Sequence, residues 1–135
     1  MPNAELNKIM LVEDDQDISA IVKYALEKNG KWVVTNCSSG KEALKTVKTL
    51  SPDLILLDVM MPEMDGIQTF NEIRKIPVCQ SIPIVFLTAK AQKEEIESYL
   101  MLGVTAVITK PVSVIKLLDD VRQIWEKNKS DVVSE

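Results

Sequence analysis

Residues 53–58 read Asp-Leu-Ile-Leu-Leu-Asp, which places four aliphatic residues in a row between two acids. Such a run is typical of a short strand that is buried on both faces of a parallel sheet. A carboxylate at the end of a buried strand is costly unless another group compensates its charge. We therefore expect Asp58, the last residue of this run, to have a chemical role.

A second aliphatic run, residues 8–12, is also followed by acids, namely Glu13, Asp14 and Asp15. If the two runs form neighbouring parallel strands, their carboxylates converge at one edge of the sheet. Such a cluster indicates a divalent cation and a reactive aspartate. We expect Glu13, by contrast, to have a structural role.

Composition limits the classes of function. The chain has 135 residues, of which 46% are hydrophobic, and this size fits one domain. Its net charge of −4 argues against non-specific nucleic-acid binding, which needs a basic face. The chain contains no histidine, and this excludes a histidine-containing zinc site, a Ser-His-Asp triad and a phosphohistidine carrier.

Nothing in the sequence predicts a membrane or secretory location. No apolar run approaches the roughly 18 residues of a membrane span, and the first residues lack the pattern of a signal peptide. Cys37 and Cys79 are far apart and do not form a metal-binding spacing. We interpret them as free thiols in a reducing cytoplasm.

Aliphatic strands alternate with amphipathic helices along the whole chain. Strands are expected at 8–12, 32–36, 53–58, 82–87 and 104–109, and apolar residues recur at helical spacing within 18–26, 43–50, 67–73, 92–102 and 114–125. This alternation predicts an α/β fold with a doubly wound, five-stranded parallel sheet. We expect one domain over 1–135, with a core at about 7–127 and a flexible tail at 128–135.

Ligands of such sheets bind beyond the carboxyl ends of the strands. The polar candidates of this sequence occur at those ends: Asp14, Asp15, Asp58, Thr88 and Lys110. Carboxylates a few ångströms apart repel by about 4 kcal/mol per pair at an effective dielectric constant near 20, and Mg²⁺ would remove that repulsion. Aspartate can accept a phosphoryl group, which a lysine and a threonine hydroxyl can then contact.

The chain resembles the receiver domain of two-component response regulators over about residues 7–127. The resemblance depends on four segments in the expected order, at residues 11–15, 58–66, 83–89 and 110–111. It implies a flavodoxin-like (βα)5 fold with strand order 2-1-3-4-5. It also implies a phosphorylation-dependent signalling switch in the cytoplasm, which catalyses only its own phosphoryl transfer and loss and is not otherwise an enzyme.

The resemblance also implies roles for individual residues. Asp58 is the phosphoacceptor, with a sensor histidine kinase or a phosphotransfer protein as the donor. Asp14, Asp15, Asp58 and the backbone carbonyl of Met60 bind Mg²⁺, or Mn²⁺ in its place, with Asp15 as the more direct ligand of the acidic pair.

In the second half of the chain, the resemblance implies that Thr88 is the switch hydroxyl and that Lys110 is the phosphate-binding lysine. It also implies a cis bond between Lys110 and Pro111. The fourth helix, fifth strand and fifth helix form the signalling face, where a downstream protein or a second copy of the phosphorylated chain would bind. No direct nucleic-acid or membrane partner is implied.

The sequence departs from the family pattern at two informative places. Many receivers have an aromatic residue three positions before the lysine, and this chain has Val107. Valine has no ring to turn inward, so the usual coupling of threonine to an aromatic side chain is not expected here. Met60 and Lys90 occupy positions that tune phosphoryl loss, and the bulky Met60 predicts stable phosphorylation.

Two other functions stay open. The acids could serve a magnesium-dependent phosphohydrolase with an aspartyl nucleophile, although such enzymes usually place the nucleophile after the first strand and carry a substrate cap. The fold could also bind a flavin, but acids after the first strand would repel its phosphate. Turnover of phosphate esters or flavin absorbance would distinguish these alternatives.

Overall fold

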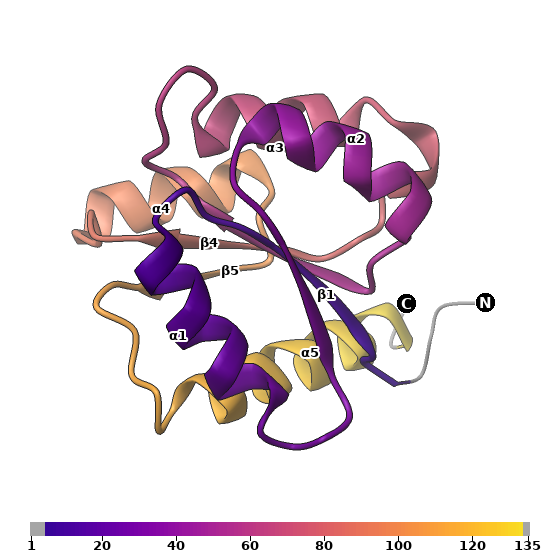
Figure 1. The fold of residues 1–135 in the computed structure, drawn as a ribbon. Coiled ribbons are helices and arrows are strands. Elements are labelled where there is room, and N and C mark those ends of the chain that lie inside the picture. The colour runs from indigo at the N-terminus through magenta and orange to yellow at the C-terminus, as the bar shows by residue number, and fades with distance from the viewer. Residues whose placement is uncertain (1–4, 134–135) are drawn as a thin grey trace.

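A computed structural model describes residues 5–133, with side chains described through residue 130. Its five-stranded sheet has the strand order β2-β1-β3-β4-β5, and every pairing is parallel (Figure 1). The strands are β1 (Lys8–Val12), β2 (Val33–Cys37), β3 (Leu54–Asp58), β4 (Ile84–Thr88) and β5 (Ala106–Thr109). The predicted α/β fold and strand order are therefore confirmed.

Helices alternate with these strands along the described chain. They are α1 (Gln16–Glu27), α2 (Gly40–Leu50), α3 (Gly66–Arg74), α4 (Lys93–Leu102) and α5 (Leu117–Val133), and a 3-10 turn, Pro77–Cys79, follows α3. The helical pattern predicted from Val114 onward starts too early. Residues 114–116 form a turn, and α5 begins after them. Residues 128–133 belong to α5, and the flexibility expected of the tail stays a prediction, with 134–135 outside the described residues.

Two hydrophobic layers enclose the sheet. Alternate residues of each central strand point to opposite faces, so Met10 packs with α2, α3 and α4, whereas Leu11 packs with α1 and α5. β3 and β4 are buried along their whole length, as expected for central strands with aliphatic sequences. Since both faces are covered, polar chemistry is confined to the ends of the strands.

Both cysteines are free and buried in the layer beneath α2, α3 and α4, which confirms the interpretation as unpaired thiols. Among the described residues, no helix is both long enough and apolar enough to cross a bilayer.

Candidate functional site

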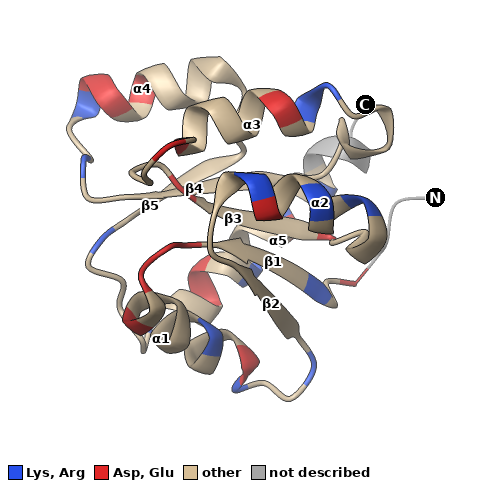
Figure 2. Cartoon of the chain, turned by 45° about the horizontal axis from the view of Figure 1, so that its top comes forward, with Lys and Arg blue, Asp and Glu red and all other residues tan. Residues whose placement is uncertain are grey.

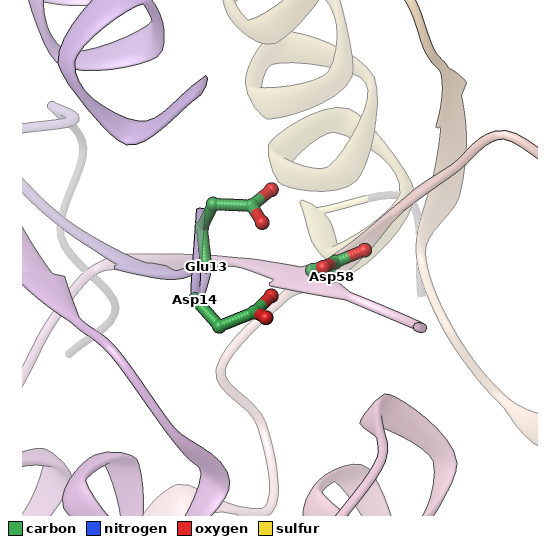
Figure 3. Close-up of side chains that lie close together, drawn as sticks. All are labelled: Glu13, Asp14 and Asp58. Atoms are coloured by element: carbon green, nitrogen blue, oxygen red, sulfur yellow. The ribbon is translucent and has the colours of Figure 1, made fainter. Parts of the chain in front are cut away.

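The carboxyl ends of β1 and β3 place three carboxylates together. The two strands are direct neighbours, with Val12 opposite Leu57. Glu13 and Asp14 follow β1, and Asp58 is the last residue of β3. Carboxylate oxygens of Glu13, Asp14 and Asp58 lie within 4.8 Å of one another, and Figure 3 shows the three side chains turned toward the same space. The convergence predicted for Asp14 and Asp58 is thus observed.

Asp15 does not join this cluster. Its backbone is extended at the start of α1, and its Oδ1 accepts hydrogen bonds from the N–H groups of Asp17 at 2.9 Å and Ile18 at 3.1 Å. This is the geometry of an N-cap, which satisfies backbone donors that have no partner inside the helix. The structure therefore favours Glu13 over Asp15 as the second acid of the cluster.

Glu13 is the member of the cluster that sequence reasoning assigned only a structural role. It is 1% exposed, and its Oε2 accepts a hydrogen bond from the N–H of Asp15 at 3.2 Å. Three acids in a row do not reveal which of them turns inward. The available signal was the start of the helical pattern directly after Asp15, which marks that residue as the cap.

Lys110 brings a positive charge to the cluster from the end of β5. Its Nζ lies 2.8 Å from Oε1 of Glu13 and 3.1 Å from Oδ1 of Asp58, and its side chain is only 16% exposed. The peptide bond from Lys110 to Pro111 is cis, as the family resemblance implied. With all side chains ionised, three carboxylates face one lysine, so the cluster keeps an excess of negative charge.

The surroundings raise the pKa values of both Glu13 and Lys110. Burial raises the pKa of Glu13 from 4.5 to about 7; the hydrogen bond from Lys110 opposes this shift, and the negative charge of Asp58 adds to it. Burial alone would lower the pKa of Lys110, but its bonds to Glu13 and its attraction to Asp58 outweigh burial and raise it. Lys110 is therefore the fixed positive charge of the site.

Thr88 ends β4 on the far side of Asp58. It is fully buried, and its Oγ1 accepts a hydrogen bond from the N–H of Lys90 at 2.9 Å. The N–H of Lys110 donates to the carbonyl of Thr88 at 2.9 Å, which ties the ends of β4 and β5 together. The hydroxyl of Thr88 accepts one bond and can still donate its own proton.

The residues after β3 constrain Asp58, with one contact to its carboxylate and close packing against its backbone. The N–H of Met60 donates to Oδ1 of Asp58 at 3.2 Å, while the Met60 side chain is 55% exposed. Gly66 packs so closely that a Cβ atom there would lie 2.4 Å from the Asp58 carbonyl oxygen and 2.6 Å from Cα of Val59. Only glycine fits this position unless the backbone of Asp58 moves.

A cation would suit this donor set. The cluster offers carboxylate oxygens, which hard divalent cations such as Mg²⁺ prefer, and the excess negative charge would be neutralised by one. In Figure 2, where Asp and Glu are red, the loop between β1 and α1 is also red. The arrangement places a buried carboxylate 3.1 Å from a lysine, with a threonine at the end of the neighbouring strand, and these groups suit the site to hold a phosphoryl group.

Comparisons with known proteins agree with this geometry. The family model described as "Response regulator receiver domain" matches residues 9–122. An uncharacterised 14.6 kDa protein of Leptolyngbya boryana is 36% identical over 115 residues, which cover 85% of this chain and 87% of that protein. The alkaline phosphatase synthesis transcriptional regulatory protein PhoP of Bacillus subtilis is 42% identical over 106 residues, or 78% of this chain.

Solved structures show the same architecture. The chemotaxis protein CheY4 of Vibrio cholerae superposes with a TM-score of 0.81 at 26% identity, covering 89% of this chain and 99% of that one. By contrast, the chain spans 43% of PhoP and 56% of the phosphate regulon transcriptional regulatory protein PhoB of Rhizobium meliloti.

Proposed function

Given that the chain belongs to the response regulator receiver domain family, we propose that it switches between two states when Asp58 accepts a phosphoryl group. Receiver domains are phospho-accepting signalling modules of two-component systems, not conventional enzymes, and they partner with histidine kinases. The observation that carries the proposal is the position of Asp58, which is 2% exposed, lies among other acids and is 3.1 Å from Lys110.

The contacts of Asp58 support different roles for its two oxygens. Among the described residues, the N–H of Met60 and the amine of Lys110 both contact Oδ1. We therefore assign the attack to Oδ2. This oxygen forms a bond to phosphorus, the bond from phosphorus to the donor's histidine nitrogen breaks, and the electron pair of that bond returns to the nitrogen. The product is a mixed anhydride on Asp58.

The acidic triad is of the kind that binds Mg²⁺ in this family. For this chain we propose Glu13, Asp14 and Asp58 as the side chains that hold it, with the backbone carbonyl of Met60 as a further ligand and Mn²⁺ as a substitute. When bound, the ion would neutralise charge on the phosphoryl oxygens. Asp15 fixes the start of α1 and thereby positions its neighbour Asp14.

After transfer, two groups are placed to sense the new charge. Lys110 is already held at the site by Glu13 and Asp58, and it can pair with a phosphoryl oxygen as a point charge. The Thr88 hydroxyl can donate to a second oxygen, since it is buried at the neighbouring strand end. Shifting a population from 1:99 to 99:1 requires about 5.5 kcal/mol of differential stabilisation, which such charge-assisted bonds can supply in large part.

The output we propose is a change in the surface formed by α4, β5 and α5. A downstream protein, or a second phosphorylated copy, would bind there, and the phosphoryl donor would be a sensor histidine kinase or a phosphotransfer protein. We place this exchange in the cytoplasm. The hydrolase alternative loses support, because the chain belongs to a family of signalling modules.

Incubation with acetyl phosphate and Mg²⁺, followed by intact-mass measurement, tests the proposal. We expect a gain of one phosphoryl group in the wild type and none in Asp58→Asn. Asp65→Asn is the matched control, because asparagine can keep the N-cap that Asp65 forms at α3. A wild-type mass that does not change, or an Asp58→Asn variant that still gains a phosphoryl group, would contradict the proposal.

A further inference from the structure

One side chain anchors α4 on the sheet. Of the α4 residues, all of which lie in the described part of the chain, Tyr99 is the buried one. Its neighbours Leu100 and Met101 are exposed to 46% and 88%. A helix with so little buried surface can shift at low cost, so the anchor controls where α4 sits.

Tyr99 packs against Phe86 in the middle of β4. The two ring centroids are 5.3 Å apart, and the ring planes meet at 77°, which is an edge-to-face contact. On its other side Phe86 makes a second edge-to-face contact with Phe70 of α3, at 5.9 Å and 80°. These contacts depend on ring orientation, so a tilt of Phe86 changes how well Tyr99 fits.

Phe86 lies close to the candidate site along the sheet. It precedes Thr88 by two residues, so both side chains point to the face of the sheet that α4 covers. In the sheet it lies opposite Leu57, the residue before Asp58. Thr88 in turn accepts the N–H of Lys90, in the segment that leads into α4. A movement of Thr88 can therefore act on Phe86 through β4 and on α4 through the segment at Lys90.

β4 also pairs with β5, and the β5 residue beside Phe86 has a small side chain. Phe86 lies opposite Val107 of β5, which is partly buried against the same core layer and has no ring. The rings next to Phe86 come instead from two helices, Tyr99 of α4 and Phe70 of α3. β5 thus supplies no ring to the surroundings of Phe86, whereas α4 does.

We propose that Tyr99 is the positioning residue that couples the occupancy of the Asp58 site to α4 in this chain. The inference rests on the proposed function. When the Thr88 hydroxyl turns toward a phosphoryl oxygen, the Phe86 ring shifts with β4, and Tyr99 follows because the two rings fit edge to face. The packed core has two discrete arrangements, and α4 moves between them as a unit.

Fluorine NMR of protein labelled with 3-fluorotyrosine tests the coupling. The chain has two tyrosines: Tyr99, and Tyr24 on α1, which is 65% exposed and serves as an internal control. Addition of Mg²⁺ and beryllofluoride, a phosphoryl mimic, should shift the Tyr99 resonance and leave Tyr24 unchanged. The amide resonances of Asp58 and Thr88, recorded on the same protein, report binding of the mimic independently.

The outcomes separate the two claims. If the amides of Asp58 and Thr88 respond but Tyr99 does not, the coupling role is contradicted and the proposed function stands. If neither responds, the proposed function fails and the coupling role fails with it. A Tyr99 shift that persists in Asp58→Asn also contradicts the coupling, because it would not depend on the site.

Two substitutions distinguish coupling from mere packing. Tyr99→Phe keeps the ring, whereas Tyr99→Leu removes it. The readout is the ratio of the hydrogen-exchange rates of the α4 amides without and with the bound mimic. Overall destabilisation alone would not change this ratio. In Tyr99→Leu this ratio should move toward one by about two- to tenfold, the range that an edge-to-face pair can supply, and Tyr99→Phe should resemble the wild type. An unchanged ratio in Tyr99→Leu would overturn the inference.

Discussion

The Nζ atom of Lys110 lies 2.8 Å from Oε1 of Glu13, which links the end of β5 to a carboxylate that is almost fully buried after β1. The same amine is 3.1 Å from Asp58. One lysine thus offsets part of the repulsion between two buried acids. Its loss should affect both the stability of the fold and the chemistry of Asp58.

Replacement of Lys110 by methionine should lower the free energy of unfolding by about 3 kcal/mol at a pH above 7, because removing one partner of a buried ion pair leaves the other charge uncompensated. The loss should be smaller below that pH, where Glu13 is protonated. Urea denaturation at both pH values measures the difference. Lys116→Met, at an exposed position, is the control, and an equal loss in both variants would contradict the role of Lys110.

The raised pKa of Glu13 predicts how the metal-free protein responds to pH. The folded state keeps the Glu13 proton up to about pH 7, whereas the unfolded chain releases it near 4.5. Between these values the folded state binds more protons, so stability falls as pH rises. The contribution is complete below the lower value and lost above the upper one.

We expect this slope in chelator-treated protein between the two pKa values of Glu13, 4.5 and about 7, with an upper limit of about 1.4 kcal/mol per pH unit. Thermal or urea unfolding across that range measures it. Glu13→Gln mimics the protonated form and should flatten the curve. A wild type and a Glu13→Gln variant with the same slope would show that Glu13 does not titrate in this window.

Gly66 and Gly30 make a matched pair. Alanine at Gly66 would meet the Asp58 carbonyl oxygen at 2.4 Å, so Gly66→Ala should displace Asp58, slow phosphorylation by acetyl phosphate and cost about 1–3 kcal/mol of stability. Alanine at Gly30 meets no atom within 4 Å and carries only the strain of a φ of +72°. Gly30→Ala should keep the wild-type phosphorylation rate, and equal rates in the two variants would contradict the role of Gly66.

Much of the site follows from the sequence because parallel strands bring their carboxyl ends to one edge. Asp58 and Thr88 each end a recognisable strand and Lys110 directly follows one, so the order of neighbouring strands gathers them. The choice between Glu13 and Asp15 does not follow in this way, because consecutive residues after a strand can turn to either side. That choice is made by the start of α1, whose backbone donors recruit Asp15.

The contact between Tyr99 and Phe86 could not be predicted from the sequence, for a similar reason. The spacing of Ile96, Tyr99 and Leu100 predicts an apolar side of α4, but in the structure Leu100 is 46% exposed. Which of these side chains reaches the sheet depends on the rotation of the helix about its axis. The spacing of apolar residues alone does not fix that rotation, because Ile96, Tyr99 and Leu100 all fit the pattern.

Met60 should slow the loss of the phosphoryl group. Its N–H binds Oδ1 of Asp58, so its side chain starts beside the site, where its bulk hinders an attacking water. Met60→Asn should therefore shorten the lifetime of the phosphorylated protein severalfold, as measured by intact mass over time. Val78→Asn, a similar exchange at an exposed position after α3, is the control. An unchanged lifetime in Met60→Asn would defeat this prediction.

Reduction of the phosphorylated protein with borohydride, followed by peptide mass spectrometry, identifies the residue that carries the phosphoryl group. Borohydride converts an aspartyl phosphate to homoserine, so the modified residue is marked in the chain. We expect homoserine at position 58 in protein treated with acetyl phosphate and Mg²⁺, and unchanged aspartate at Asp14 and Asp15. Homoserine at another acid, or a phosphorylated protein that yields none, would contradict this expectation.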